Sequence, residues 1–146
     1  MKIQTISLFF FASIFSSPFF AQALENHLWQ ERVILLFTSD FENKTLQKQL
    51  DIFEKDQNGL RDRKLITYQI TPEQIKKNGA VFFEKKLISN VLKKYKPKKE
   101  EFTFILIGLD SGEKMRSTKV VSLEKLFGKI DQMPMRKFQL EQKKNN

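Results

Sequence analysis

The fold of this chain is decided by the stretch Phe102-Thr-Phe-Ile-Leu-Ile-Gly-Leu-Asp-Ser-Gly-Glu-Lys-Met-Arg116. Residues 102–109 are apolar on both faces, which predicts a central strand. Asp110-Ser111-Gly112 predicts a hairpin turn in which Gly112 takes a positive φ, followed by a returning strand over residues 113–117. The stretch therefore predicts two antiparallel strands joined by a tight turn.

A helix is expected directly after this hairpin. Ser122 is a suitable N-cap, and Glu124 lies in the first turn, where the helix dipole favours a negative charge. Pro134 is expected to end the helix, and residues 137–146 are expected to form a frayed polar tail. Four apolar residues at helical spacing form its buried face: Leu123, Leu126, Phe127 and Ile130.

The residues before the hairpin alternate between strand and helix patterns. Residues 33–37 are continuously apolar and predict another central strand, and residues 46–53 carry the spacing of an amphipathic helix. Residues 64–71 alternate and predict a strand nearer an edge, and a long helix is expected from about Ala80 until Lys96-Pro97. Because the crossover between the first two strands is right-handed, those strands should be parallel. The order predicts an α/β domain with a central four-stranded mixed sheet (β-α-β-α-β-β-α) flanked by helices.

Four motifs carry a resemblance to a known family. They are Leu28-Trp29-Gln-Glu-Arg32-Val-Ile-Leu-Leu-Phe37, Leu60-Arg-Asp-Arg63, Gly108-Leu-Asp-Ser-Gly-Glu-Lys-Met-Arg-Ser117 and Ile130-Asp-Gln-Met-Pro-Met-Arg136. Together they resemble the uncharacterised bacterial family called domain of unknown function 4174, and related domains occur in secreted sushi-repeat proteins. The resemblance covers about Leu28 to Arg136 and implies a thioredoxin-like fold. It implies no activity, because the family has none established.

The N-terminus has the pattern of a secretory signal peptide. Lys2 supplies a positive charge, residues 6–15 form a short apolar run, and Ala21-Gln22-Ala23 offers the small residues that signal peptidase needs. We expect cleavage after Ala23 and export to the periplasm or beyond, with no membrane span after processing. The alternative is an uncleaved membrane anchor. The predicted organisation is a signal peptide (1–23), a thioredoxin-like domain (24–137) and a polar C-terminal tail (138–146).

Thiol and metal chemistry lack the residues that they need. The chain has no cysteine, which excludes disulfide exchange and thiol peroxidase catalysis. In a thioredoxin-type enzyme the nucleophilic cysteine lies where the first strand meets the first helix, and residues 38–45 occupy that place here. His27 is the only histidine, so we expect neither a catalytic triad nor a multi-histidine zinc site, and no metal or cofactor.

Seven residues are weak candidates for binding. Met133 and Met135 offer either a flexible recognition surface or a plug for the core, and Arg136 is expected to pair with Asp131 or Asp110. Asp110-Ser-Gly is interpreted as a turn, because it is too short for a calcium loop. A role for Asp40 in a cleft competes with a simpler one in a turn. The full set is Asp40, Asp110, Arg116, Asp131, Met133, Met135 and Arg136.

The chain is basic, with a formal net charge of +9. A positive region is expected on the helix before Pro97 and the loop after it, formed by Lys93, Lys94, Lys96, Lys98 and Lys99. No aromatic residues interleave with these lysines to stack bases, which argues against specific binding of single-stranded nucleic acid. The region is either a solvated face that maintains solubility or an unspecific site for polyanions.

Three functions remain compatible with the sequence. The first is an exported, non-catalytic binding or interaction module for an unknown envelope or extracellular protein or an anionic glycan. The second is a cofactor-independent enzyme of unrecognised type that uses carboxylates and Arg136. The third is an unspecific polyanion-binding protein.

Overall fold

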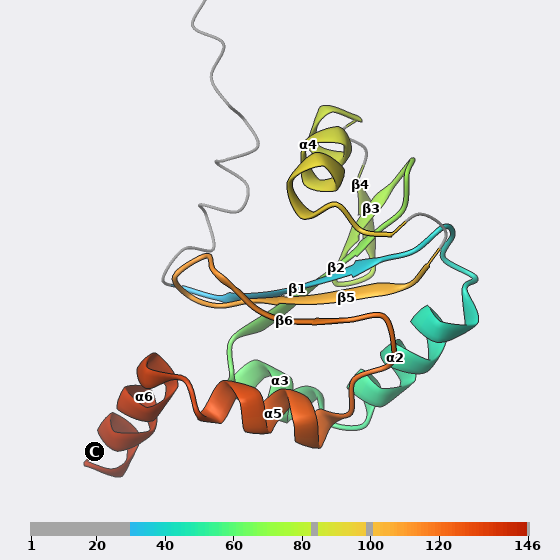
Figure 1. Ribbon diagram of the computed structural model, residues 1–146. Helices are drawn as coiled ribbons and strands as arrows, with labels where there is room; N and C mark the ends of the chain where they lie inside the picture. The colour runs from blue at the N-terminus through green and yellow to red at the C-terminus, as the bar shows by residue number, and fades with distance from the viewer. Residues whose placement is uncertain (1–29, 83–84, 99–100, 146) are drawn as a thin grey trace, which may run out of the picture.

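A computed structural model describes residues 30–82, 85–98 and 101–145. The predicted signal peptide, His27 and Lys99 lie outside these described residues. The described chain forms one mixed sheet with helices on both faces (Figure 1). Its strands lie in the order β4 (Ala80–Phe82), β3 (Ile75–Lys77), β2 (Leu65–Ile70), β1 (Arg32–Phe37), β5 (Thr103–Ile107) and β6 (Glu113–Ser117).

The predicted strand pairing is confirmed at the centre of the sheet. β1 pairs in parallel with β2, as the right-handed crossover requires, and antiparallel with β5 on its other side. β5 and β6 form the predicted hairpin, and its register shifts at a bulge between Leu106 and Ile107. The α/β class is therefore as predicted, but the sheet has six strands instead of four, and β2 lies inside it instead of near an edge.

The helices divide between the two faces. α4 (Lys85–Tyr95) covers one face, and the other face is covered by α2 (Lys44–Glu54), α3 (Gln57–Asp62) and α5 (Leu123–Asp131) (Figure 1). Ser122 caps α5 as predicted, since its hydroxyl accepts a hydrogen bond from the Lys125 amide. Among the described residues, no helix is long and apolar enough to cross a membrane.

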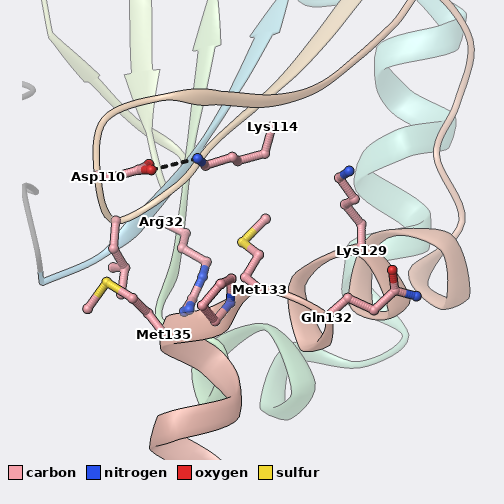
Figure 2. A pocket seen from close by; sticks show the side chains of 9 residues that line it. Arg32, Asp110, Lys114, Lys129, Gln132, Met133 and Met135 are labelled. Carbon is pink, nitrogen blue, oxygen red and sulfur yellow. Dashed lines mark hydrogen bonds and ion pairs between the residues drawn. The ribbon is translucent and has the colours of Figure 1, made fainter.

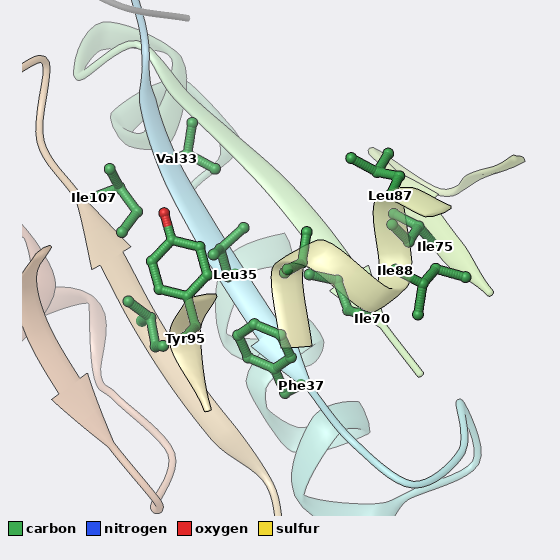
Figure 3. Packing of buried hydrophobic residues seen from close by; sticks show 11 residues of the cluster. Val33, Leu35, Phe37, Ile70, Ile75, Leu87, Ile88, Tyr95 and Ile107 are labelled. Atoms are coloured by element: carbon green, nitrogen blue, oxygen red, sulfur yellow. The ribbon is translucent and has the colours of Figure 1, made fainter. Parts of the chain in front are cut away.

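Each face of β1 contributes to its own apolar core. Val33, Leu35 and Phe37 point toward α4 and pack with residues such as Tyr95 (Figure 3). Ile34 and Leu36 point the other way, into the core beneath α2 and α5. All six residues of β1 are buried, which is the pattern expected of a central strand covered on both faces.

The extra strands replace the predicted start of the long helix. Residues 75–82 form a small hairpin, β3–β4, instead of a loop and the first helical turn, and α4 begins only at Lys85. Asn78 and Gly79 join the two strands with φ values of 47° and 86°. An Asn-Gly pair is the usual sequence of such a two-residue turn, because both central residues need a positive φ.

The C-terminal segment also differs from the prediction. Residues 134–144 form a helix, α6 (Pro134–Lys144), which includes most of the frayed tail expected over residues 137–146. Pro134 stands at the first position of α6, where its missing N–H removes no hydrogen bond. Pro134 therefore separates two helices, α5 and α6, and the last helix of the chain reaches Lys144.

The β5–β6 turn uses a different residue from the one predicted. Gly112 does not have a positive φ, whereas Ser111 does, at 59°. The Asp110 side chain accepts a hydrogen bond from the Gly112 amide at 3.1 Å, and the Gly108 amide donates to the Gly112 carbonyl at 2.9 Å. These bonds fix the turn so that Ser111, and not Gly112, takes the left-handed conformation.

The positive φ of Ser111 predicts which residues the turn tolerates at this position. Ser111→Gly should stabilise the domain by up to about 1 kcal/mol, because glycine enters the left-handed region without the Cβ clash. Ser111→Val should destabilise it by roughly 1–2 kcal/mol, since a branched side chain is worst there. Denaturant unfolding of the two variants measures both effects.

Gly112→Ala is the matched control. A Cβ at Gly112 would lie 3.2 Å from the Lys114 Nζ, the flexible end of a side chain. The change should therefore stay within about 0.5 kcal/mol. A larger loss at Gly112 than at Ser111 would contradict this account of the turn.

Candidate functional site

An ionic cluster with two buried arginines and two partly exposed carboxylates lies on the α5 side of the sheet, at the ends of four elements. Arg32 begins β1, Asp62 and Arg63 stand at the end of α3, Asp131 ends α5, and Arg136 lies in the first turn of α6. We call these five residues the arginine cluster. Arg32 and Arg136 are only 1% and 2% exposed. Charged side chains at such depth need partners, because removing a charge from water is costly.

Asp131 pairs with two of the three arginines. Arg63 donates to both of its carboxylate oxygens, at 3.1 and 2.6 Å, and Arg136 donates to one of them at 3.2 Å. Burial raises the pKa of Asp131, but the hydrogen bonds from Arg63 and Arg136 outweigh it, so this pKa lies below its ordinary value. The guanidinium of Arg63 also stacks 3.9 Å over the ring of Phe127. Asp131 therefore stays ionised and fixes the end of α5 to the segment after α3.

Arg136 fixes α6 to the end of α3. Its guanidinium donates to the Asp62 carbonyl at 3.0 Å and also to the Asp62 carboxylate. Lys143, two turns further along α6, donates to the same carboxylate. These hydrogen bonds, first from Lys143 and then from Arg136, lower the pKa of Asp62 to about 2.

Arg32 is the one member of the cluster that is incompletely paired. One terminal nitrogen donates to the Arg63 carbonyl at 2.8 Å, but its Nε has no hydrogen-bond acceptor among the described residues. Burial, and then repulsion from Arg136, lower the pKa of Arg32. No carboxylate of the described chain forms an ion pair with Arg32, so its charge is balanced only at a distance.

A cavity of about 540 Å³ opens beside Arg32, between the β5–β6 hairpin and the junction of α5 with α6 (Figure 2). Its walls are mostly apolar, and its rim carries an ion pair in which Lys114 donates to Asp110 at 2.6 Å. That hydrogen bond lowers the pKa of Asp110. We call this the Arg32 cavity; it is lined by Arg32, Leu109, Asp110, Lys114, Lys129, Gln132, Met133, Pro134 and Met135.

Three of the seven predicted binding residues line the Arg32 cavity. They are Asp110, Met133 and Met135. Asp131 and Arg136 belong to the arginine cluster, where Arg136 forms one of the two ion pairs proposed for it, with Asp131 and not with Asp110. Met133 is partly buried against the core, as a plug would be, but Met135 is 38% exposed.

The other two predicted residues lie elsewhere. Arg116 pairs with Glu113 at 2.7 Å on β6 and donates to the Tyr95 carbonyl at 3.1 Å. Asp40 lies in the loop after β1, where its carboxylate accepts a hydrogen bond from Ser39 at 2.9 Å. The cap of α2 in this region is Asn43, whose side chain accepts from the amides of the first turn.

Sequence reasoning missed Arg32, Lys114 and Lys129 as lining residues. A signal for Arg32 was available, because it directly precedes five residues that are apolar on both faces. An arginine joined to such a strand must be drawn toward the interior, where it needs a counter-charge. Lys114 and Lys129 had no comparable signal, since exposed lysines occur throughout the chain.

The predicted basic region lies on the opposite face of the sheet from the arginine cluster. Lys93, Lys94, Lys96 and Lys98 are exposed on α4 and just after it. Lys98 forms an exposed ion pair with Glu101 at 3.5 Å. Within the described ranges, no group of three or more histidine, cysteine, aspartate or glutamate residues is arranged to hold a metal ion.

The low pKa of Asp62 predicts how acid affects the domain. In the unfolded chain Asp62 should titrate near its ordinary pKa of 3.8, whereas in the folded domain it stays ionised down to about 2. Its contribution to stability is therefore complete above the higher value and lost as the pH falls toward the lower one. Denaturant midpoints of the wild type should fall across this range, and those of Asp62→Asn should fall less. Asp51→Asn, at an exposed position on α2, is the control and should follow the wild type.

Comparison with known proteins agrees with this fold. The crystal structure of reduced 2-Cys peroxiredoxin from Plasmodium vivax superposes with a TM-score of 0.57 at 12% sequence identity, over 82% of this chain and 84% of that chain. This similarity confirms the thioredoxin-like fold and carries no further conclusion about activity. The search of curated proteins found no match. The family model "Domain of unknown function (DUF4174)" matches residues 23–139, and the chain is therefore a member of this family.

Proposed function

We propose that the protein is an exported, non-catalytic binding module that takes its ligand in the Arg32 cavity. The observation that carries this proposal is the cavity itself, about 540 Å³ in volume, with apolar walls and a buried, incompletely paired arginine. Ligand sites in proteins are usually apolar hollows of this size with a few convergent polar groups. The cavity also gathers residues from three of the four family motifs, at 28–37, 108–117 and 130–136.

Export is proposed from the N-terminal sequence alone. Lys2, the apolar run of residues 6–15 and Ala21-Gln22-Ala23 match the three parts of a signal peptide. A module with this targeting segment would meet its ligand in the periplasm or outside the cell.

The absence of thiol chemistry supports a binding role over a redox role. The peroxiredoxin shares the fold, but this chain has no cysteine that could serve as a nucleophile. At the β1–α2 junction, where thioredoxin-type enzymes carry that nucleophile, Ser39 and Asp40 bond to each other. A serine hydroxyl there has no histidine nearby in the described chain to activate it.

The carboxylates of the cluster give less support to the rival hypothesis of an enzyme than to a binding module. Asp131 is held by two arginines and its pKa is lowered, so it is a poor proton donor or acceptor near neutral pH. Arg136 is 2% exposed and is fully engaged with Asp62 and Asp131. Both groups act as structural parts of the cluster, so of the residues suggested for the rival only Asp110 lies in the cavity.

Methionine methyl groups provide a direct test of the cavity. Met133 and Met135 line it, whereas Met115 lies outside it on β6. In protein labelled at the methionine methyl groups, a library of small acids, amines and neutral compounds should contain members that shift the Met133 and Met135 signals. Met115 is the internal control and should not respond. If no compound shifts Met133 or Met135 selectively, the cavity is not a binding site and the proposal fails.

The non-catalytic part is tested by redox assays. The purified domain should neither reduce insulin disulfides nor consume hydrogen peroxide catalytically, because no thiolate is available to carry either reaction. A thioredoxin and a peroxiredoxin serve as positive controls. Turnover by the domain above the uncatalysed rate in either assay would contradict the proposal.

A further inference from the structure

The charges of the arginine cluster do not balance. Three guanidinium groups, those of Arg32, Arg63 and Arg136, face two carboxylates, those of Asp62 and Asp131. Arg63 and Arg136 take both carboxylates in direct ion pairs, so Arg32 is left without an ion pair to any described residue. Lys143 also bonds to Asp62, which leaves still less negative charge for Arg32. Counted without the exposed Lys143, the three arginines and two carboxylates of the cluster thus carry an excess of one positive charge next to the Arg32 cavity.

The rim of the cavity adds positive potential without adding a counter-charge. Among the described residues that line the cavity, Asp110 is the only carboxylate, and it is neutralised by Lys114. Lys129 also lines the cavity and has no ion pair with any described residue. The first turn of α6 begins at Pro134 in the cavity wall and contains no acidic residue, so the positive end of its helix dipole is not offset there.

Apart from Gln132, the remaining lining residues of the cavity are apolar. Leu109, Met133 and Pro134 contribute hydrocarbon and thioether surface beside the charged groups. Figure 2 shows the Arg32 side chain between those of Met133 and Met135. Methionine side chains are flexible and adapt to ligands of varied shape. The Arg32 Nε is sealed from solvent, so a ligand that bonds to it requires such a side chain to move aside.

We propose that the ligand of the Arg32 cavity is a carboxylic acid with an apolar body, whose carboxylate accepts a hydrogen bond from the Arg32 Nε while its apolar part lies against Met133 and Leu109. A single negative charge matches the single unpaired positive charge, and a carboxylate oxygen suits a guanidinium N–H. This inference rests on the proposed function, because it names the class of ligand for the same cavity.

The test compares compounds that share one apolar body and differ in the head group. Hexanoate, hexanol, hexylamine and hexyl phosphate are titrated separately into protein labelled at the methionine methyl groups. Hexanoate should shift Met133 and Met135 and should bind roughly tenfold or more tightly than hexanol, because a charge-assisted hydrogen bond is lost in the alcohol. Hexylamine should bind more weakly than hexanol, since the cavity is positive.

Two variants identify the residue responsible. Arg32→Met keeps an unbranched stem but removes the guanidinium and its charge, so hexanoate and hexanol should then bind about equally. Because this change also removes a buried, incompletely paired charge, its denaturant midpoint should be equal to or higher than that of the wild type. Lys93→Met is the matched control: it removes one positive charge on α4 and should leave the preference for hexanoate unchanged.

The outcomes separate this inference from the function on which it depends. Equal binding of hexanol and hexanoate to the wild type would overturn the carboxylate, while the cavity would remain a binding site. Tighter binding of hexyl phosphate than of hexanoate would overturn it in favour of a phosphate ester. A loss of preference in Lys93→Met as large as in Arg32→Met would show that net charge, and not Arg32, selects anions. If no compound selectively shifts the Met133 or Met135 signals, the proposed function itself is contradicted.

Discussion

Burial of β1 on both faces is the constraint on which the rest of the structure depends. Its alternate residues contribute to both apolar cores, and it pairs along its length with β2 on one side and β5 on the other. Because every residue of β1 is buried, both faces of the strand must be covered, and helices cover each of them. Its first residue, Arg32, is carried into the interior with it. The arginine cluster is thus a consequence of placing a charged residue at the start of a fully buried strand.

The C-terminal helix is held mainly by charge. Arg136 is the only residue of α6 that is fully buried, and Phe138 is 58% exposed. Met133 and Pro134 begin the helix, and the guanidinium two residues later reaches back to Asp62 and Asp131. The Met-Pro-Met-Arg motif therefore begins α6 and also supplies the arginine that binds this helix to Asp62 and Asp131. Removing one partner of such a buried pair is usually far more damaging than replacing the pair with apolar residues.

The sequence allowed the central elements to be predicted, because their patterns are long and their burial is complete. The strand at 33–37, a strand within 102–109, the parallel pairing of the first two strands, the hairpin to 113–117 and the capped helix after Ser122 are confirmed. The β3–β4 hairpin was missed because strands of three residues are too short to show a period, although Asn78-Gly79 was a usable signal. The choice of Gly112 over Ser111 was wrong, since bonds from the Asp110 side chain and the Gly108 amide decide which residue turns left-handed.

The candidate site was predictable only in part. Residues within one motif, such as Asp131 and Arg136, are close in sequence, and their pairing could be anticipated. The contact of Arg136 with Asp62 spans 74 positions, and the place of Arg32 beside the cavity depends on how β1 meets α5 and α6. Such contacts follow from the tertiary packing and leave no local pattern in the sequence.

The two edge strands of the sheet, β4 and β6, affect how well the protein resists aggregation at high concentration. Both outer strands would offer unpaired backbone groups to a second chain, which is how ordered aggregates grow. β4 is only three residues long, and β6 carries Glu113, Lys114 and Arg116 within five residues and follows a bulge in its partner. Short length, alternating charge and local twist are the means by which natural sheets prevent such growth. The short β4 and the charged β6 therefore protect the domain from edge-to-edge aggregation, without any disulfide to restrain the chain.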